Sequence, residues 1–315
     1  MIKASEEEHG RDTHAALYRT VLAMAVLAGL GWYIWHARHQ LAVVFHINAR
    51  YLFPMILVPL VSLGANGLIG RELVAEFGVK LSPKEWYGLA VVNSLGNYLP
   101  LPQAGAIARG MYLKRVYGLS YVTYGATLVV TYVSAVALYG ILGLIGLGVL
   151  AILGRPTPLF LWVIFAALTG SLLLFTPAVR YLPLPRRLVE VRTHLKSLHH
   201  PHLLRRIILL QTLLVALTTT GLWLACQTLP DGHEVTWPVA LMLGLMILAS
   251  GIVNVTPGNI GVEQGVAELS ARLFHIAPNI GFLGSALFRA VAVMTILVIG
   301  PVFSGWLARR KAANH

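Results

Sequence analysis

Long apolar runs separated by short polar segments dominate this chain, and polar residues interrupt two of those runs near their middle. A helix needs about 20 apolar residues to cross a hydrocarbon core about 30 Å thick. Runs of this length predict six membrane-spanning helices, at about residues 15–35, 52–75, 121–150, 158–179, 207–229 and 281–307. The two interrupted regions, at about 86–108 and 237–276, predict shorter helices that bend inside the apolar layer.

The interruptions are Asn97–Gly105 (NYLPLPQAG) and Thr256–Gly265 (TPGNIGVEQG). Backbone groups released by proline and glycine cost several kcal/mol each in hydrocarbon, so broken segments at membrane depth normally line a cavity in the protein. We therefore expect the two breaks to form one polar site. The residues that would break the helices are Pro100, Pro102, Pro257, Gly258 and Gly261.

Composition supports a membrane protein. The chain is 57% hydrophobic and 11% charged, whereas about a quarter of the residues of a soluble globular domain are charged. Its polar stretches are too short for a soluble catalytic domain of about 100 residues. We interpret residues 1–315 as a single membrane domain.

Charge sets the expected orientation. The chain carries 24 Lys and Arg against 12 Asp and Glu, and this excess lies between apolar spans without any nucleic-acid-binding signature, so no nucleic-acid partner is expected. The basic connection at about residues 180–206 has the positive-inside pattern of a cytoplasmic loop. Counting crossings from it places both termini in the cytoplasm.

The same count makes each interrupted region enter and leave the membrane on one side, as a re-entrant helical hairpin. The first half, about 15–150, then has the order span, span, hairpin, span, and the second half, about 158–307, repeats that order inverted. The predicted fold class is therefore an all-α polytopic membrane protein with an inverted repeat. In an alternative, 237–256 and 259–276 are two full crossings, which leaves the orientation of all the other helices unchanged.

Inverted repeats with discontinuous helices are the architecture of alternating-access carriers. In the second hairpin a helix is expected to start near Asn259, which either caps that helix or contacts a ligand with the free amides there. Glu263 on its first turn and Arg289 in the last span are charges at membrane depth that need compensation. We expect them to pair, or Arg289 to hold an anionic ligand that Glu263 tunes.

In the first hairpin, Asn97, Gln103 and Arg109 supply polar groups. Arg109 is either a headgroup contact or an ordinary positive-inside charge. Glu268 and Arg272 are spaced i, i+4 and should pair on one helix face. The chain has no P-loop, GxSxG or HExxH spacing, so we expect no enzyme, no cofactor and no metal site.

The two interruptions resemble those of the lysylphosphatidylglycerol synthase/flippase transmembrane-region family. The resemblance covers most of the chain and is carried by Asn97–Gly110 (NYLPLPQAGAIARG), Pro257–Gly265 (PGNIGVEQG) and Ala286–Arg289 (ALFR). It implies translocation of polar lipids between leaflets. Many relatives have Glu where this chain has Ala106. The chain resembles the stand-alone membrane half of the family, without the synthase domain of the bifunctional members, so we do not expect it to synthesise the lipid.

Together these observations predict a lipid translocase of the cytoplasmic (inner) membrane. Its cavity would admit a polar or anionic headgroup while the lipid tails stay in the bilayer. The alternatives are an undecaprenyl-phosphate-type carrier and a small-anion secondary transporter. Membrane lipid is the expected partner, and the sequence leaves a homo-oligomer open.

Overall fold

The computed structural model describes residues 49–99, 103–181, 200–251, 259 and 261–313, and all regular secondary structure in these ranges is helical. The long helices are α3 (Ala49–Ala75), α6 (Tyr121–Ile152), α7 (Leu159–Tyr181), α9 (Pro201–Gln227) and α12 (Pro278–Ala313). The short elements are α4 (Pro83–Gly96), α5 (Ala104–Tyr117), α10 (Trp237–Ser250), α11 (Val262–Leu273) and the 3-10 turn η2 (Gly232–Glu234).

The prediction of a helical membrane protein is confirmed. Among the described residues, α3, α6, α9 and α12 are long and apolar enough to cross a membrane. Helix α7 coincides with the span expected at 158–179, and the span expected at 15–35 lies outside the described residues. Helix α9 begins about six residues before the predicted 207, because Pro201 at its first position starts a helix that hydropathy alone does not reveal.

Both interrupted regions form pairs of short helices. Helices α4, α5 and α10 have 14 residues each and α11 has 12, so none is longer than about 21 Å at 1.5 Å per residue. Arg109, Lys114 and Arg115 lie beyond the predicted interrupted region at 86–108 and would be expected in a loop, but they belong to α5. Lys and Arg are good helix formers, but a search for apolar runs does not detect a helix that contains them.

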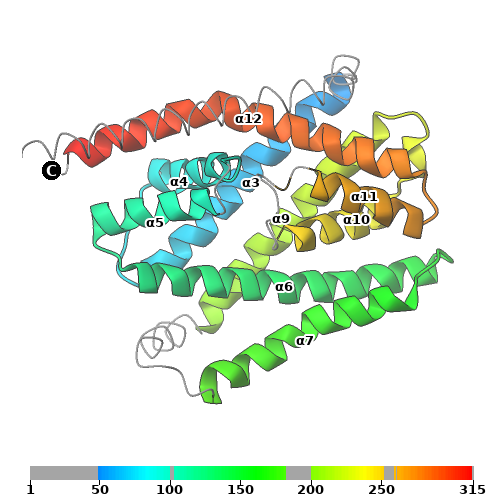
Figure 1. Cartoon of the computed structure of the whole chain (residues 1–315), viewed down its shortest axis with the longest axis horizontal. Coiled ribbons are helices and arrows are strands. Elements are labelled where there is room, and N and C mark those ends of the chain that lie inside the picture. The colour runs from blue at the N-terminus through cyan, green and yellow to red at the C-terminus, as the bar shows by residue number, and fades with distance from the viewer. Residues whose placement is uncertain (1–48, 100–102, 182–199, 252–258, 260, 314–315) are drawn as a thin grey trace, which may run out of the picture.

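The short pairs lie on either side of two central helices. Helices α3 and α9 lie next to each other in the middle of the molecule, with α12 above and α6 below them in Figure 1. Helix α4 packs against α3, α5 and α12, and α10 packs against α9, α11 and α6. Helix α7 packs on the outside of α6.

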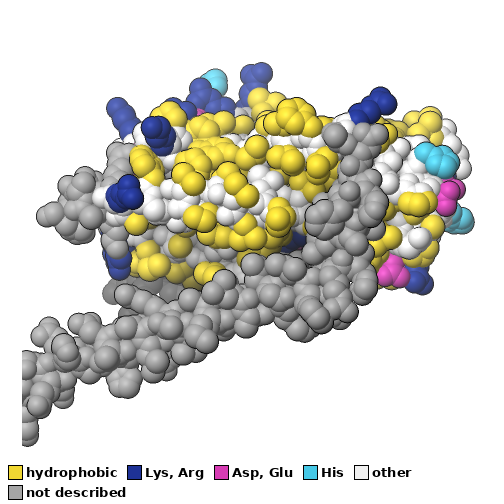
Figure 2. Space-filling model, turned by 90° about the horizontal axis from the view of Figure 1, so that it is seen from above, with side chains coloured by type: hydrophobic (Ala, Val, Ile, Leu, Met, Phe, Trp, Pro, Cys, Tyr) yellow, Lys and Arg dark blue, Asp and Glu magenta, His cyan; other side chains and the backbone are white. Residues whose placement is uncertain are grey.

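The two ends of the molecule differ in charge. Helices α3 and α5 end, and α4, α6 and α9 begin, at the end that carries exposed Lys and Arg side chains, which we call the basic end; its exposed cations include Arg71, Lys80, Lys84, Lys114, Arg115, Arg205 and Arg206. The opposite end carries Asp231, His233 and Glu234, together with the exposed Arg155 and Arg272. Figure 2 shows a largely apolar face between one end with Lys and Arg and another end where acidic, histidine and a few Lys or Arg side chains are mixed.

The chain enters and leaves each short pair at one of these ends. Leu81 and Leu89 at the start of α4 share a buried cluster with Leu113 and Leu119 at the end of α5, at the basic end. Val235 and Val239 at the start of α10 share another cluster with Phe274 and Ile276 after α11, at the opposite end. The inner ends of both pairs therefore point toward the middle of the molecule.

Candidate functional site

A polar cavity of about 290 Å³ lies where the inner ends of the two short pairs meet. Five helices surround it, so residues far apart in the sequence share one wall. We call it the central cavity. Its polar and aromatic lining consists of Ser62, Asn66, Ser94, Asn97, Tyr98, Thr218, Asn259, Glu263, Phe288 and Arg289.

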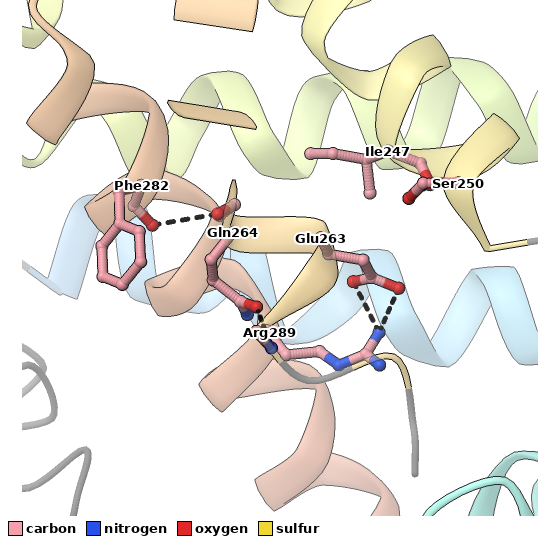
Figure 3. A network of polar contacts seen from close by, with 8 residues as sticks. Ile247, Ser250, Glu263, Gln264, Phe282 and Arg289 are labelled. Atoms are coloured by element: carbon pink, nitrogen blue, oxygen red, sulfur yellow. Dashed lines mark hydrogen bonds and ion pairs between the residues drawn. The ribbon is translucent and has the colours of Figure 1, made fainter. Parts of the chain in front are cut away.

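The charged centre of the cavity is an ion pair between Glu263 on α11 and Arg289 on α12. Nη1 of Arg289 lies 2.9 Å from Oε2 and 3.2 Å from Oε1 of Glu263, as Figure 3 shows. The two side chains are only 15% and 19% exposed, respectively. The predicted pairing is confirmed, and it compensates two charges that would be costly alone at membrane depth.

The first short pair reaches the same charges. Tyr98, which follows α4, places its ring centroid 5.3 Å from the guanidinium carbon of Arg289, within the range of a cation–π interaction. Asn97, the C-cap residue of α4, also lines the cavity. Arg289 is therefore the point where the end of α4 and the start of α11 come together.

The start of α11 explains how Glu263 is positioned. Gly261 is the N-cap residue with φ of 85°, a backbone conformation that favours glycine. Oε1 of Gln264 accepts a hydrogen bond of 2.7 Å from the backbone N–H of Gly261. This closed first turn places Glu263, the second residue of α11, at the cavity wall. The first backbone amides of a helix have no partner within the helix.

Asn259 does not cap α11, so that alternative is wrong. The cap falls two residues later because Asn259 is itself left-handed, with φ of 58°. Its side chain is 2% exposed and lies within reach of the Glu263 carboxylate. Neither polar atom of its amide makes a hydrogen bond of good geometry with the described residues. Buried polar groups normally have well-formed hydrogen bonds, so this amide can take a partner from a ligand.

Gln103 lies in a second cavity of about 400 Å³ that continues from the first. Both cavities share Asn66, Asn97, Thr218, Glu263 and Arg289 among their lining residues. The second extends toward α6, where the hydroxyl of Tyr132 donates a 3.3 Å hydrogen bond to Oε1 of Gln103. Its walls there are mostly apolar, including Ala135, Leu222, Ile247 and Leu248.

Arg109 does not line either cavity. Its guanidinium lies against Gly70 of α3, so close that a side chain at position 70 would overlap it. Gly70 is one helical turn along α3 from Asn66, toward the basic end. Nε of Arg109 is buried without a hydrogen-bond partner among the described residues.

Five of the six polar residues predicted for the site therefore line connected cavities: Asn97, Gln103, Asn259, Glu263 and Arg289. Of the predicted breaks, Gly261 is the N-cap of α11, whereas Pro100, Pro102, Pro257 and Gly258 lie outside the described residues. Sequence reasoning missed Asn66 and Thr218. The only sign of these two residues in the sequence is that each is a polar residue inside an apolar span. Such a residue alone does not reveal which face of the helix its side chain occupies.

A second buried acid, which sequence reasoning also missed, lies in the first short pair close to the basic end of the molecule. Glu85 on α4 is fully buried and accepts hydrogen bonds from the hydroxyls of Tyr112 and Tyr117 on α5 and from Ser82. The distances are 3.1 Å, 2.5 Å and 2.7 Å, respectively. This network ties α4 to α5 and so helps to position Asn97 and Tyr98.

Comparison with protein families identifies the family of the chain. The model of the family described as the lysylphosphatidylglycerol synthase TM region matches residues 20–300. The chain belongs to this family of membrane proteins, and membership indicates a lipid-related function. Comparison with curated proteins finds no relative that matches the chain.

Proposed function

We propose that this protein is a lipid translocase. A polar headgroup passes through the central cavity, while the acyl or isoprenoid chains of the lipid remain in the bilayer. The proposal assigns binding and passage to the chain and no chemical step. The observation that carries it is the Glu263–Arg289 pair in a polar cavity between two short helix pairs, in a chain of a lipid-related membrane family.

The geometry supports two re-entrant hairpins in an inverted repeat. Helices α3, α4, α5 and α6 match α9, α10, α11 and α12 in order, and the two short pairs open at opposite ends of the molecule. With the basic end in the cytoplasm, a cavity between their inner ends would lie near the bilayer midplane. Alternating access from either side is the mechanism that this arrangement favours.

Cavity size and charge support a lipid over a small anion. A lipid with two acyl chains far exceeds about 290 Å³, so its chains would have to remain outside the protein. A small anion would need an available positive charge, and the Arg289 guanidinium is already neutralised by Glu263. We therefore place the small-anion transporter second.

Reconstitution into liposomes tests the proposal. Lipids with a nitrobenzoxadiazole fluorophore on one acyl chain would be bleached from outside by dithionite, and the wild-type protein should expose inner-leaflet probe faster than protein-free liposomes do. The double variant Glu263→Gln/Arg289→Gln, which keeps the net charge of the cavity, should lose this activity.

Glu268→Gln is the matched control, because Glu268 lies on α11 but pairs with the exposed Arg272 at 2.7 Å and lines neither cavity. It should transport at the wild-type rate. Wild-type rates in the double variant would contradict the assignment of the cavity.

A further inference from the structure

The described residues that line the two cavities carry no net charge. Glu263 and Arg289 are the acid and base among them, and they neutralise each other. The neighbouring sequence at 100–102, 252–258 and 260 contains no Lys, Arg, Asp or Glu. An anionic headgroup would have to take Arg289 from Glu263, leaving a buried carboxylate without compensation.

The remaining polar lining is uncharged and comes from several elements. Carboxamides are supplied by Asn66 on α3, Asn97 after α4 and Asn259 before α11, and hydroxyls by Ser62, Ser94 and Thr218. Amides and hydroxyls both donate and accept hydrogen bonds. A ligand hydroxyl also does both, so such a lining matches a ligand with many hydroxyls better than one with acceptors alone.

Asn259 is the strongest single indication. Its amide is buried and lacks a well-formed hydrogen bond to the described residues, so a ligand that supplies both a donor and an acceptor would satisfy it. Two aromatic rings, Tyr98 and Phe288, line the same cavity. Such rings can pack against the C–H face of a sugar while its hydroxyls contact the amides.

We infer that the headgroup taken by this cavity is uncharged and rich in hydroxyls, that is, a sugar or polyol carried on a lipid. The inference rests on the proposed function, because it names the headgroup class for the same passage. A volume of about 290 Å³ corresponds to about ten water molecules at about 30 Å³ each. A single sugar ring is smaller than this space.

Three probes that differ only in headgroup test the inference in proteoliposomes of the full chain. Each carries the same nitrobenzoxadiazole acyl chain on glucosyl diacylglycerol, phosphatidylserine or phosphatidylcholine. We expect the glucosyl probe to be translocated at least tenfold faster than either phospholipid. An equal or higher rate for phosphatidylserine or phosphatidylcholine overturns the headgroup inference and leaves the translocase proposal intact. Translocation of none of the probes overturns both.

Two variants locate the effect in the cavity. Asn259→Ala and Thr218→Val each remove an uncharged polar group from the lining, and each should slow the glucosyl probe at least fivefold. Asn279→Ala is the matched control, because Asn279 is exposed at the start of α12 and lines neither cavity. Wild-type glucosyl rates in both cavity variants, with unchanged thermal unfolding midpoints, overturn the inference.

Discussion

The two short helix pairs have similar shapes but are held by different interactions. Where α4 meets α5, Gly96 and Gly105 bring the two backbones together, and a Cβ on Gly105 would lie 1.8 Å from the carbonyl oxygen of Asn93. In the second pair, α11 instead packs closely on α12, where a Cβ on Gly281 would lie 2.4 Å from the carbonyl oxygen of Ala267. Both pairs pack internally and against α12, but the tight glycine contact lies within the first pair and, in the second, between α11 and α12.

The acids of the two pairs also lie at different depths. Glu85 is at the outer base of the first pair and hydrogen-bonds tyrosines within that pair. Glu263 is at the inner end of the second pair and binds Arg289 of α12. The first pair has Ala106 near its inner end. The comparison teaches that the first pair supplies an uncharged part of the cavity wall, while the second pair and α12 each supply one charge of the site.

The largest effect should come from breaking the ion pair of the second short pair. Arg289→Ala leaves Glu263 buried without compensation, which typically costs about 3–5 kcal/mol. Arg109→Ala in the first pair should cost less, because Arg109 forms no ion pair with a described acid. Thermal unfolding of the purified variants in detergent would measure both. Equal losses would contradict the proposed difference between the pairs.

The next effect should come from the base of the first pair. Glu85→Ala removes an acceptor of several hydrogen bonds and leaves the hydroxyls of Tyr112 and Tyr117 without it, so we expect a loss of about 2–3 kcal/mol in unfolding free energy. Denaturation in detergent mixtures would measure it. Glu76→Gln is the control, because Glu76 is exposed near the same end, and it should behave as wild type. Unchanged stability in Glu85→Ala would show that the network does not hold α4 to α5.

A smaller effect should come from the glycine contact inside the first pair. Gly105→Ala forces α5 away from α4, and overpacking of this kind costs about 1–3 kcal/mol. Gly125→Ala on α6 meets no atom within 4 Å and should be neutral or slightly stabilising, because alanine is the better helix former. Unfolding midpoints of both variants would measure the difference. Indistinguishable midpoints would contradict the close approach of the two helices.

The smallest effect should come from the outer face of α11. Glu268→Gln breaks an exposed i, i+4 pair with Arg272, and such pairs contribute about 1 kcal/mol at most. Its unfolding midpoint should therefore stay close to that of wild type. A loss as large as that of Arg289→Ala would show that position along α11, and not burial, decides the effect.

Much of the fold could be predicted from the sequence because lipid imposes simple rules. The lengths of the apolar runs predicted the positions of α3, α6, α7 and α12, and most of the predicted ends lie within a few residues of the observed ones. The end of α12 extends beyond the predicted 307, since a helix continues through polar residues once it has left the apolar layer. For the same reason hydropathy does not reveal the polar second half of α5.

The ion pair could be predicted because two charges at membrane depth must be compensated, and few partners were available to Glu263 and Arg289. Asn66 and Thr218 could not be assigned, since a single amide or hydroxyl is tolerated on any face of an apolar helix. Glu85 was missed because its partners, Tyr112 and Tyr117, come from a helix that hydropathy did not reveal. The position of the α11 cap depended on the left-handed backbone at Asn259, which sequence alone does not specify.

Chemical blockage of the central cavity tests the proposed passage of a lipid headgroup most directly. Ser94 on α4 lines this cavity, and the single native cysteine, Cys226, is buried. A Cys226→Ala/Ser94→Cys protein should translocate labelled lipid before treatment and stop after reaction with a bulky methanethiosulfonate reagent, while Cys226→Ala alone should be unaffected. Full lipid translocation by protein that mass spectrometry shows to be completely modified at position 94 would contradict passage through this cavity.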